Sequence, residues 1–397
     1  MAPRTRLVHI GPHKTGTTAL QGAFHRAREE LAAHGVLYAG SGRQAKEPAV
    51  AVTEGPGGDL GPWEALCAEA ESAGESRVMI SSEFFSNADE DAARAVVEGL
   101  RGGPAHVVVT LRPLLRILPS HWQQYVKHGL CHSYEDWLTG LLRRPADEPP
   151  AAEFWHRHRH DLLLERWAVA AGAENVTVVV VDDARPERLF RSFEKLLGLP
   201  DGLLVPEEGG GNRSLTLGQA ELLLRLNRRL AESPVPGRPR QALVRDGVVP
   251  RLQGYSPAPG EPRIVTPAWA QEAASAVAEK MVAAIAGSGL RVIGDLAALT
   301  PPPGGPQACA APEVIPTAVA VEAVLGGIAA GAAVPRPRPV PPPERAKASR
   351  PEGSLKTEDP AVEDRPVRRV PARDLLRVLG RRGVRRLRRG LRGRAGR

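Results

Sequence analysis

One segment near the N-terminus constrains the fold more than any other, because a short apolar run leads through a loop rich in glycine and threonine into a helix. The apolar run covers residues 6–10, the loop GPHKTGTT covers 11–18, and a helix is expected over 19–34. Two glycines at this spacing between a strand and a helix are typical of loops whose backbone amides hold phosphate. The N-terminus of the helix adds a dipole that favours an anion. The segment therefore predicts a phosphate-binding loop.

Apolar strands and helix patterns alternate along the chain as far as about residue 300. Strands are expected over residues 36–37, 77–81, 106–111 and 176–181, and a loop over 40–61. Helices are expected over residues 64–73, 89–101, 114–128, 188–197, 216–231 and 267–285. The strands are continuous apolar runs, which indicates burial on both faces. We therefore predict an α/β fold of the P-loop NTPase-like type, with three layers and a central parallel sheet.

The composition changes after residue 300. Residues 301–371 are rich in proline and alanine, which predicts a disordered, low-complexity linker that cannot bury a core. Residues 372–397 are expected to form a basic amphipathic tail. From Arg365 to Arg397 there are fourteen arginines and one acid, a net charge of +13 in a chain whose total is +8. This tail favours an anionic membrane surface as a partner, and its lack of aromatic residues argues against specific recognition of nucleic acid.

The three cysteines, at positions 67, 131 and 309, are odd in number and widely spaced. This pattern argues against a disulfide framework or a zinc site and favours a reducing compartment. The N-terminus lacks the apolar core of a signal peptide. Residues 314–334 are the strongest membrane candidate, but alanine and glycine dominate them and we do not expect them to span a bilayer. We therefore expect a cytoplasmic protein, with peripheral attachment to a membrane as an option.

The loop departs from that of a nucleotide kinase at one position. Thr17 stands where the kinase lysine is expected, the lysine lies upstream at Lys14, and Thr18 keeps the hydroxyl position. A kinase needs its lysine at the β- and γ-phosphates and its hydroxyl on Mg²⁺. A donor with one phosphate and one sulfate has no γ-phosphate, so the displaced lysine favours this shorter donor. Asp182 and Asp183, at a strand end, leave a Mg²⁺-dependent kinase open, unless they only cap the next turn.

A second anion site is expected at the end of the strand over 106–111. Arg112 follows this strand, at the edge where α/β sheets bind ligands, and its planar set of donors suits phosphate. Ser120 lies eight residues later, about two helical turns, and could present its hydroxyl to the same point. Pro113 and Pro119 could alter the turn and the helix. Arg116 fits a donor contact and a structural salt bridge equally well.

These two segments resemble the motifs of sulfotransferases that use 3′-phosphoadenosine 5′-phosphosulfate (PAPS). The loop is similar to the family pattern P-K-[SAT]-G-T-[TS] with one residue inserted, and the second segment to R-x-P-x-x-x-x-x-S-x-[YW] with the proline one place early. The resemblance implies a sulfotransferase domain over residues 1–300, PAPS as co-substrate and no metal. It also implies which residues bind the donor: Pro12, His13, Lys14, Thr15, Gly16, Thr17 and Thr18 the 5′-phosphosulfate, and Arg112 and Ser120 the 3′-phosphate.

The resemblance also implies a catalytic base. Sulfuryl transfer needs a group that removes the acceptor proton. Glu83 follows the strand over 77–81 and corresponds by position to the glutamate base of carbohydrate-directed members; it could also merely begin a helix. His13, inside the loop, is the second candidate, ahead of His9 and His121. Lys14 is expected to stabilise the transferring group.

Two other functions remain open at this stage. One is a Mg²⁺-dependent nucleotide kinase, and the other is an inactive nucleotide-binding protein tethered through its basic tail. The acceptor is expected to be a small molecule, a lipid or a carbohydrate, held by loops over 40–61, 129–150 and 233–262. The histidines of the segment WHRHRH, residues 155–160, are expected on a helix surface rather than at a metal.

Overall fold

A parallel sheet forms the centre of the protein. The computed structural model describes residues 1–333 apart from 55–57, 150, 208–212, 234–239 and 303–313. Six strands occur in this part: β1 (Arg6–Ile10), β2 (Val36–Tyr38), β3 (Arg77–Ser82), β4 (Ala105–Leu111), β5 (Val176–Val180) and β6 (Arg291–Ile293). Their order is β2-β3-β1-β4-β5-β6 and every pairing is parallel. The predicted central parallel sheet is confirmed.

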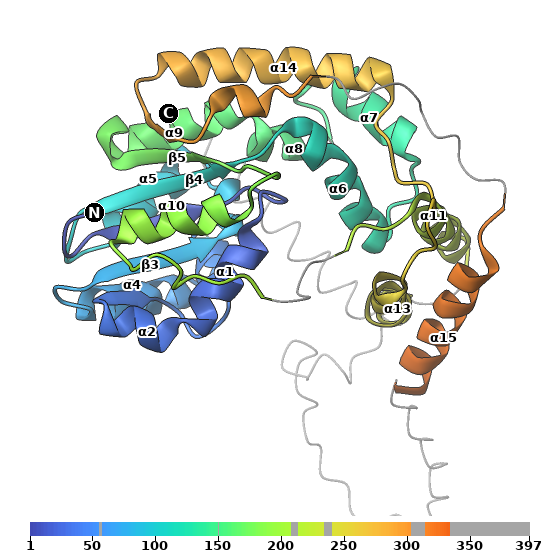
Figure 1. Cartoon of the computed structure of the whole chain (residues 1–397), viewed down its shortest axis with the longest axis horizontal. Helices are drawn as coiled ribbons and strands as arrows, with labels where there is room; N and C mark the ends of the chain where they lie inside the picture. Colours follow the sequence, from blue (N-terminus) through green and yellow to red (C-terminus); the bar gives the residue numbers. More distant parts are fainter. Residues whose placement is uncertain (55–57, 150, 208–212, 234–239, 303–313, 334–397) are drawn as a thin grey trace, which may run out of the picture. The chain divides into compact units, whose positions relative to one another are not determined.

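Successive residues of each strand are buried on opposite faces of the sheet. One face carries Val8, Val78, Val107 and Val178, and the other carries Leu7, Met79, Val108 and Val179. The first face packs against α3 (Lys46–Thr53), α4 (Gly61–Ser72), α5 (Glu90–Gly99) and α9 (His160–Ala171). The second packs against α1 (Thr17–Arg26), α2 (Arg28–Ala33) and α10 (Glu187–Leu197) (Figure 1). These three layers confirm the predicted α/β class.

A second apolar core is built from helices alone. It contains α6 (Leu114–Lys127), α7 (Tyr134–Leu142), α8 (Ala151–His158), α11 (Leu217–Ala231), the π-helix η3 (Ala242–Val248), α13 (Val249–Gly254), α14 (Ala268–Gly287) and α15 (Thr317–Ala333). Short 3₁₀ helices lie at η1 (Glu83–Asn87), η2 (Ala173–Asn175) and η4 (Leu296–Leu299). We call these helices α6–α8, α11, η3 and α13–α15 the helical half, and the sheet with α1–α5, α9 and α10 the sheet half.

Most predicted elements are present, with two differences in the sheet half. The helix expected over residues 19–34 is two helices, α1 and α2, separated at Ala27. The loop expected over 40–61 contains α3, because its residues Ala49 and Val52 are buried in the core beside Trp63 of α4. A glycine- and proline-rich composition therefore concealed a helix that tertiary packing stabilises.

The predicted linker over residues 301–371 needs a correction. Residues 317–333 form α15, and its Val319 and Ala323 are buried in the core of the helical half. Alanine has the highest intrinsic helix propensity, so this alanine-rich stretch forms a helix once it has a surface to pack on. No described helix is both long and apolar enough to cross a membrane, α15 included. Residues 334–371 of the linker and the tail over 372–397 lie outside the described residues.

Candidate functional site

The loop after β1 closes over the start of α1. Thr15 fixes its turn, because its amide and its hydroxyl both donate to the Pro12 carbonyl, at 3.2 and 2.8 Å. The Thr15 hydroxyl also lies 3.1 Å from that of Thr110 in β4. At Gly11 the chain passes so close to α1 that a Cβ atom would stand 1.7 Å from a methyl carbon of Thr17. Only glycine fits this crossing.

The loop leaves the first turn of α1 open to an anion. Gly16 precedes α1 in the left-handed conformation, with φ of 83°, and no side chain caps the helix. Amides at the start of a helix have no partner within the helix, and together with the dipole they bind oxyanions. Thr17 is buried under the loop, whereas Thr18 is exposed and can reach a ligand.

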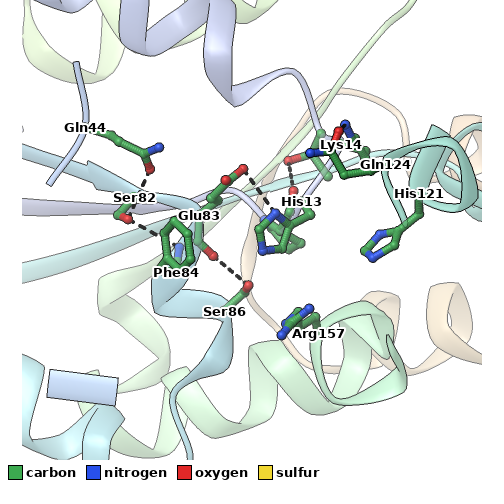
Figure 2. A network of polar contacts seen from close by, with 12 residues as sticks. His13, Lys14, Gln44, Ser82, Glu83, Phe84, Ser86, His121, Gln124 and Arg157 are labelled. Carbon is green, nitrogen blue, oxygen red and sulfur yellow. Dashed lines mark hydrogen bonds and ion pairs between the residues drawn. The ribbon is translucent and has the colours of Figure 1, made fainter. Parts of the chain in front are cut away.

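Lys14 extends from this loop toward α6. Its backbone also has a positive φ, 74°, which is uncommon outside glycine. Its ammonium donates to Gln124 Oε1 at 3.1 Å (Figure 2). Burial lowers the pKa of Lys14, and the nearby charge of Glu83 acts to raise it. A partly desolvated cation is thus held beside the open end of α1, where its field is stronger than in water.

Glu83 faces the loop from the end of β3. His13 Nδ1 lies 3.3 Å from Glu83 Oε2, and Figure 2 shows the two side chains pointing toward each other. Burial acts to raise the pKa of Glu83. The hydrogen bond and charge of His13, with the charges of Lys14 and Lys46, outweigh it and hold that pKa below its usual value. Glu83 is therefore a carboxylate at neutral pH.

The position of Glu83 is fixed by the residues around it. Ser82 caps η1, because its hydroxyl accepts from the Phe84 amide at 3.3 Å. The Ser86 hydroxyl donates to the Glu83 carbonyl at 2.6 Å, and the Phe84 ring meets the His13 ring edge-on with centroids 5.7 Å apart. Glu83 thus begins a short helix and also contacts the loop through His13.

Arg112 joins the loop to the end of β5. Its Nη1 donates to the Lys14 carbonyl at 3.2 Å, while Nε and Nη2 each donate to Asp183 at 3.0 Å. Arg116 Nε lies 3.5 Å from the same carboxylate, which supports a salt bridge for this exposed arginine. Pro113 precedes α6 as its N-cap and does not disturb the strand.

Ser120 lies on α6 one turn before Gln124, despite the proline that precedes it. Residues four apart share one face of a helix. Gln124 contacts Lys14, and Arg116 contacts the carboxylate that holds Arg112, so this face of α6 is turned toward the loop. Ser120 is half-buried, and its hydroxyl has no hydrogen-bond partner among the described residues.

The other histidine candidates are structural. His9 is buried between Ser81 and Thr110, with ring-to-hydroxyl distances of 2.9 and 3.2 Å, and burial lowers its pKa to about 3. His121 also has a pKa of about 3, chiefly through burial, and its Nδ1 lies 3.3 Å from His158 Nε2. Burial thus makes both rings weak bases, although His121 lies near the loop, with its ring centroid 6.1 Å from that of His13.

The segment over residues 155–160 is not simply a helix surface. His158 and His160 are fully buried, so the expectation of a surface cluster is wrong for these two. They lie where α8 ends and α9 begins, with the His158 ring packed on Phe154 and the His160 amide 3.2 Å from Met281 Sδ of α14. Among the described residues, no group of histidine, cysteine, aspartate and glutamate is arranged to hold a metal ion.

The strand-end acids are already paired. Asp182 accepts from the Ala184 amide at 3.0 Å and binds Arg185 at 2.8 Å, and Asp183 binds Arg112. This arrangement favours a capping role for Asp182 over a Mg²⁺-binding one.

Two residues of the site were not predicted from the sequence. These are Gln124 and Lys46, both of which reach the site from helices. The only available signal was that Gln124 lies four residues after Ser120.

Comparisons with known proteins give a distant structural likeness. No protein-family model matches the chain, and no curated protein matches it. Among solved structures, the chain is similar to a sulfotransferase from Alicyclobacillus acidocaldarius, with 17% sequence identity and a TM-score of 0.37, over 58% of this chain and 97% of that one. What the site can do therefore follows from its own geometry.

Proposed function

We propose that the protein is a sulfotransferase that moves a sulfuryl group from PAPS to a hydroxyl or amine of an acceptor. One observation carries the proposal. A phosphate-type loop before the open end of α1 holds His13 3.3 Å from the carboxylate of Glu83 and directs Lys14 to Gln124, and Arg112 is bound to the backbone of the same loop. One site thus offers backbone amides that bind an anion, a carboxylate that can accept a proton, and a cation that can stabilise developing negative charge.

The residues present suit PAPS as the donor. The uncapped first turn of α1 and the exposed hydroxyl of Thr18 can receive the phosphosulfate. Arg112 and the unpaired hydroxyl of Ser120 can receive the 3′-phosphate. Lys14 can reach the oxygen that bridges phosphorus and sulfur, since among the described residues its ammonium donates only to the neutral amide of Gln124. Sulfate transfer from this donor calls for no metal ion.

Glu83 would act as the general base. As the acceptor oxygen forms its bond to sulfur, Glu83 takes the proton from that oxygen, and the bond from sulfur to the bridging oxygen breaks. Lys14 stabilises the charge that develops on the leaving oxygen. The low pKa of free Glu83 makes it a weak base, but the negative charges of a bound donor raise that pKa toward the working pH. His13 orients the carboxylate.

Binding of the product adenosine 3′,5′-bisphosphate tests the proposal. Calorimetry on Lys14→Ala and Arg112→Ala should show affinity lowered about tenfold or more, as expected when a charged donor is lost. The exposed residues Lys195 and Arg94 supply matched control variants that should bind normally. Unchanged affinity in both site variants contradicts a PAPS site.

Two further measurements separate the alternatives. Sulfuryl transfer from labelled PAPS that persists in EDTA excludes a Mg²⁺-dependent kinase. Turnover with any small molecule, lipid or carbohydrate acceptor excludes an inactive binding protein.

We also propose that the protein attaches to anionic membranes. Val321, Val324, Leu325 and Ile328 form an exposed apolar face on α15, and the sequence that follows ends in the arginine-rich tail. An apolar helix face combined with a basic segment is typical of peripheral attachment. The full chain should co-sediment with liposomes that contain phosphatidylserine, and a chain ending at residue 335 should do so weakly. Equal co-sedimentation of both contradicts a role for the tail.

A further inference from the structure

A cavity of about 470 Å³ lies at the C-terminal end of α6, between α11 and η3. Its volume is in the range of sites that hold small organic ligands. Asn227 shapes its wall, because its side-chain amide donates to the Val126 and Leu130 carbonyls, at 2.7 and 3.0 Å, and so ties α11 to the end of α6. The cavity is separate from the sheet edge where the phosphate loop lies.

The walls of this cavity are basic. Lys127, His128, Arg240 and Arg245 line it, and none of its lining residues is acidic. We call it the basic pocket. Arg245 has a carboxylate partner in its chain neighbour Asp246, at 2.9 Å, and both side chains are largely exposed. The pocket therefore presents an excess of positive charge to whatever enters it.

Lys127 is the cation with the least compensation. It is half-buried, and it has no ion pair or hydrogen bond among the described residues. Burial, with a smaller contribution from the charge of Lys14, lowers its pKa to about 8. Burying an ammonium without a partner is unfavourable, and a bound anion would remove that cost. The basic lining of the pocket and the unpaired ammonium of Lys127 thus both favour an anionic ligand.

A line of side-chain contacts connects the basic pocket to the phosphate loop. Lys14 donates to Gln124, and the Gln124 amide nitrogen lies 3.3 Å from His128 Nε2 at the pocket wall. Gln124, which contacts Lys14, and Lys127 are three residues apart on α6, which corresponds to roughly 5 Å along the helix axis. A molecule of monosaccharide to disaccharide size can span that distance.

We propose that the basic pocket binds an anionic group of the acceptor, so that the acceptor is an acidic small molecule or acidic sugar bearing a carboxylate, phosphate or sulfate. This inference rests on the proposed sulfotransferase function. The donor does not need these cations, because Arg112 precedes α6 and Ser120 lies at its middle, about two turns before Lys127. An anion at Lys127 would instead orient the acceptor along the helix, with its reacting hydroxyl toward Lys14 and Glu83.

Chemical labelling of Lys127 provides a test that needs no knowledge of the acceptor. Limited acetylation with acetic anhydride, followed by mass spectrometry of the peptides, measures the reactivity of each lysine in the native chain. Inorganic phosphate or glucuronate should slow acetylation of Lys127 at least fivefold, and glucose should not. Lys195, exposed on α10, is the internal control and should be unaffected. Equal labelling of Lys127 with and without these anions overturns the proposal. The two anions also distinguish phosphate from carboxylate recognition.

A variant links the pocket to turnover. Lys127→Gln should raise the KM for glucuronate or glucose 6-phosphate as acceptor about tenfold, with kcat and the KM for glucose unchanged. Lys195→Gln is the matched control. An unchanged KM for the charged acceptors contradicts the proposal. Calorimetry with adenosine 3′,5′-bisphosphate separates the two levels of inference. If the wild-type protein does not bind this nucleotide, the sulfotransferase proposal is wrong. The labelling of Lys127 still decides whether the pocket binds anions.

Discussion

The sheet half and the helical half of the protein place their polar residues in different ways. In the sheet half, parallel strands bring their carboxyl ends to one edge, so His13, Glu83 and Arg112 meet although they follow three different strands. In the helical half, the polar residues that matter lie along one helix, α6, and their direction depends on how that helix packs. Strand topology fixes the first set, and side-chain packing fixes the second.

This difference suggests that the two halves have different roles. The edge of the sheet supplies the loop, the carboxylate and the arginine that transfer from a phosphate-bearing donor would need. The helical half supplies Lys127 and the basic pocket, which suit the recognition of an acceptor. Helix α6 takes part in both, because it begins beside the loop and ends at the pocket. The predictions below test whether the two roles can be separated.

The largest effect is expected for Glu83→Gln. If Glu83 is the base, kcat should fall about 10²- to 10⁴-fold. The affinity for adenosine 3′,5′-bisphosphate should stay within about twofold, because the amide keeps the shape of the side chain. Labelled PAPS measures the first quantity and calorimetry the second.

A matched control for this prediction is Glu90→Gln, since Glu90 is exposed at the start of α5. Glu83→Gln that retains more than about a tenth of the activity would point to His13 as the base. His13→Asn would then be expected to show the larger loss.

A smaller effect is expected for Asn227→Ala, which breaks the tie between α11 and α6. Removing a buried amide that makes two hydrogen bonds should lower the free energy of unfolding by about 1–3 kcal/mol. A hundredfold excess of adenosine 3′,5′-bisphosphate over its Kd should still add about 2.7 kcal/mol, as in the wild type. Thermal and urea unfolding with and without this ligand measure both quantities.

The exposed Arg229, two residues further along α11, gives the control variant Arg229→Ala, which should be neutral. If Asn227→Ala abolishes stabilisation by the nucleotide, the donor site depends on the far end of α6, and the division between the two halves is wrong.

The sheet half could largely be predicted from the sequence. Strands β1, β3, β4 and β5 are continuous apolar runs, and their parallel order brings the ends that carry His13, Glu83 and Arg112 together. The short strand β6 was missed, because its three residues are only partly buried and begin with an exposed arginine. The sequence of an edge strand of this length contains too little periodicity to separate it from a loop.

The helical half could be predicted only in part. Its long amphipathic helices were found, but α15 was taken for linker because alanine and glycine carry little apolar pattern. The orientation of side chains was also out of reach. Gln124 contacts Lys14, and His121 is buried against His158, only because of how α6 packs against its neighbours. No local pattern specifies that rotation.

A pH dependence distinguishes the two halves further. Lys127 carries its proton below a pKa of about 8 and loses it above. Lys14 from the loop is the charge that lowers this pKa beside burial. His128 just after α6, Arg240 and Arg245 line the same pocket, and Arg245 is paired with Asp246. For an acidic acceptor, kcat/KM should therefore fall as the pH rises through 8 and level off about tenfold lower, the loss expected for Lys127→Gln.

For a neutral acceptor, kcat/KM plotted against pH should not show this fall near pH 8. On the acid side, the pKa of Glu83 is lowered in the free protein, and the negative charges of the bound donor move this limb to higher pH. Both acceptors should share that acid limb. Identical profiles for charged and neutral acceptors over pH 6–10 would contradict a role for Lys127 in recognition.

The smallest effect is expected for Ser120→Ala. The Ser120 hydroxyl has no partner among the described residues, so its removal breaks no such bond in the free protein and should change stability by less than about 0.5 kcal/mol. Any loss should therefore appear in the bound state alone, as a two- to tenfold weaker affinity for adenosine 3′,5′-bisphosphate. Arg112 differs, because removing it also leaves Asp183 without its closest partner. Ser72→Ala, at an exposed serine of α4, is the control. Ser120→Ala with wild-type affinity would remove α6 from the donor site and leave the helical half with the acceptor alone.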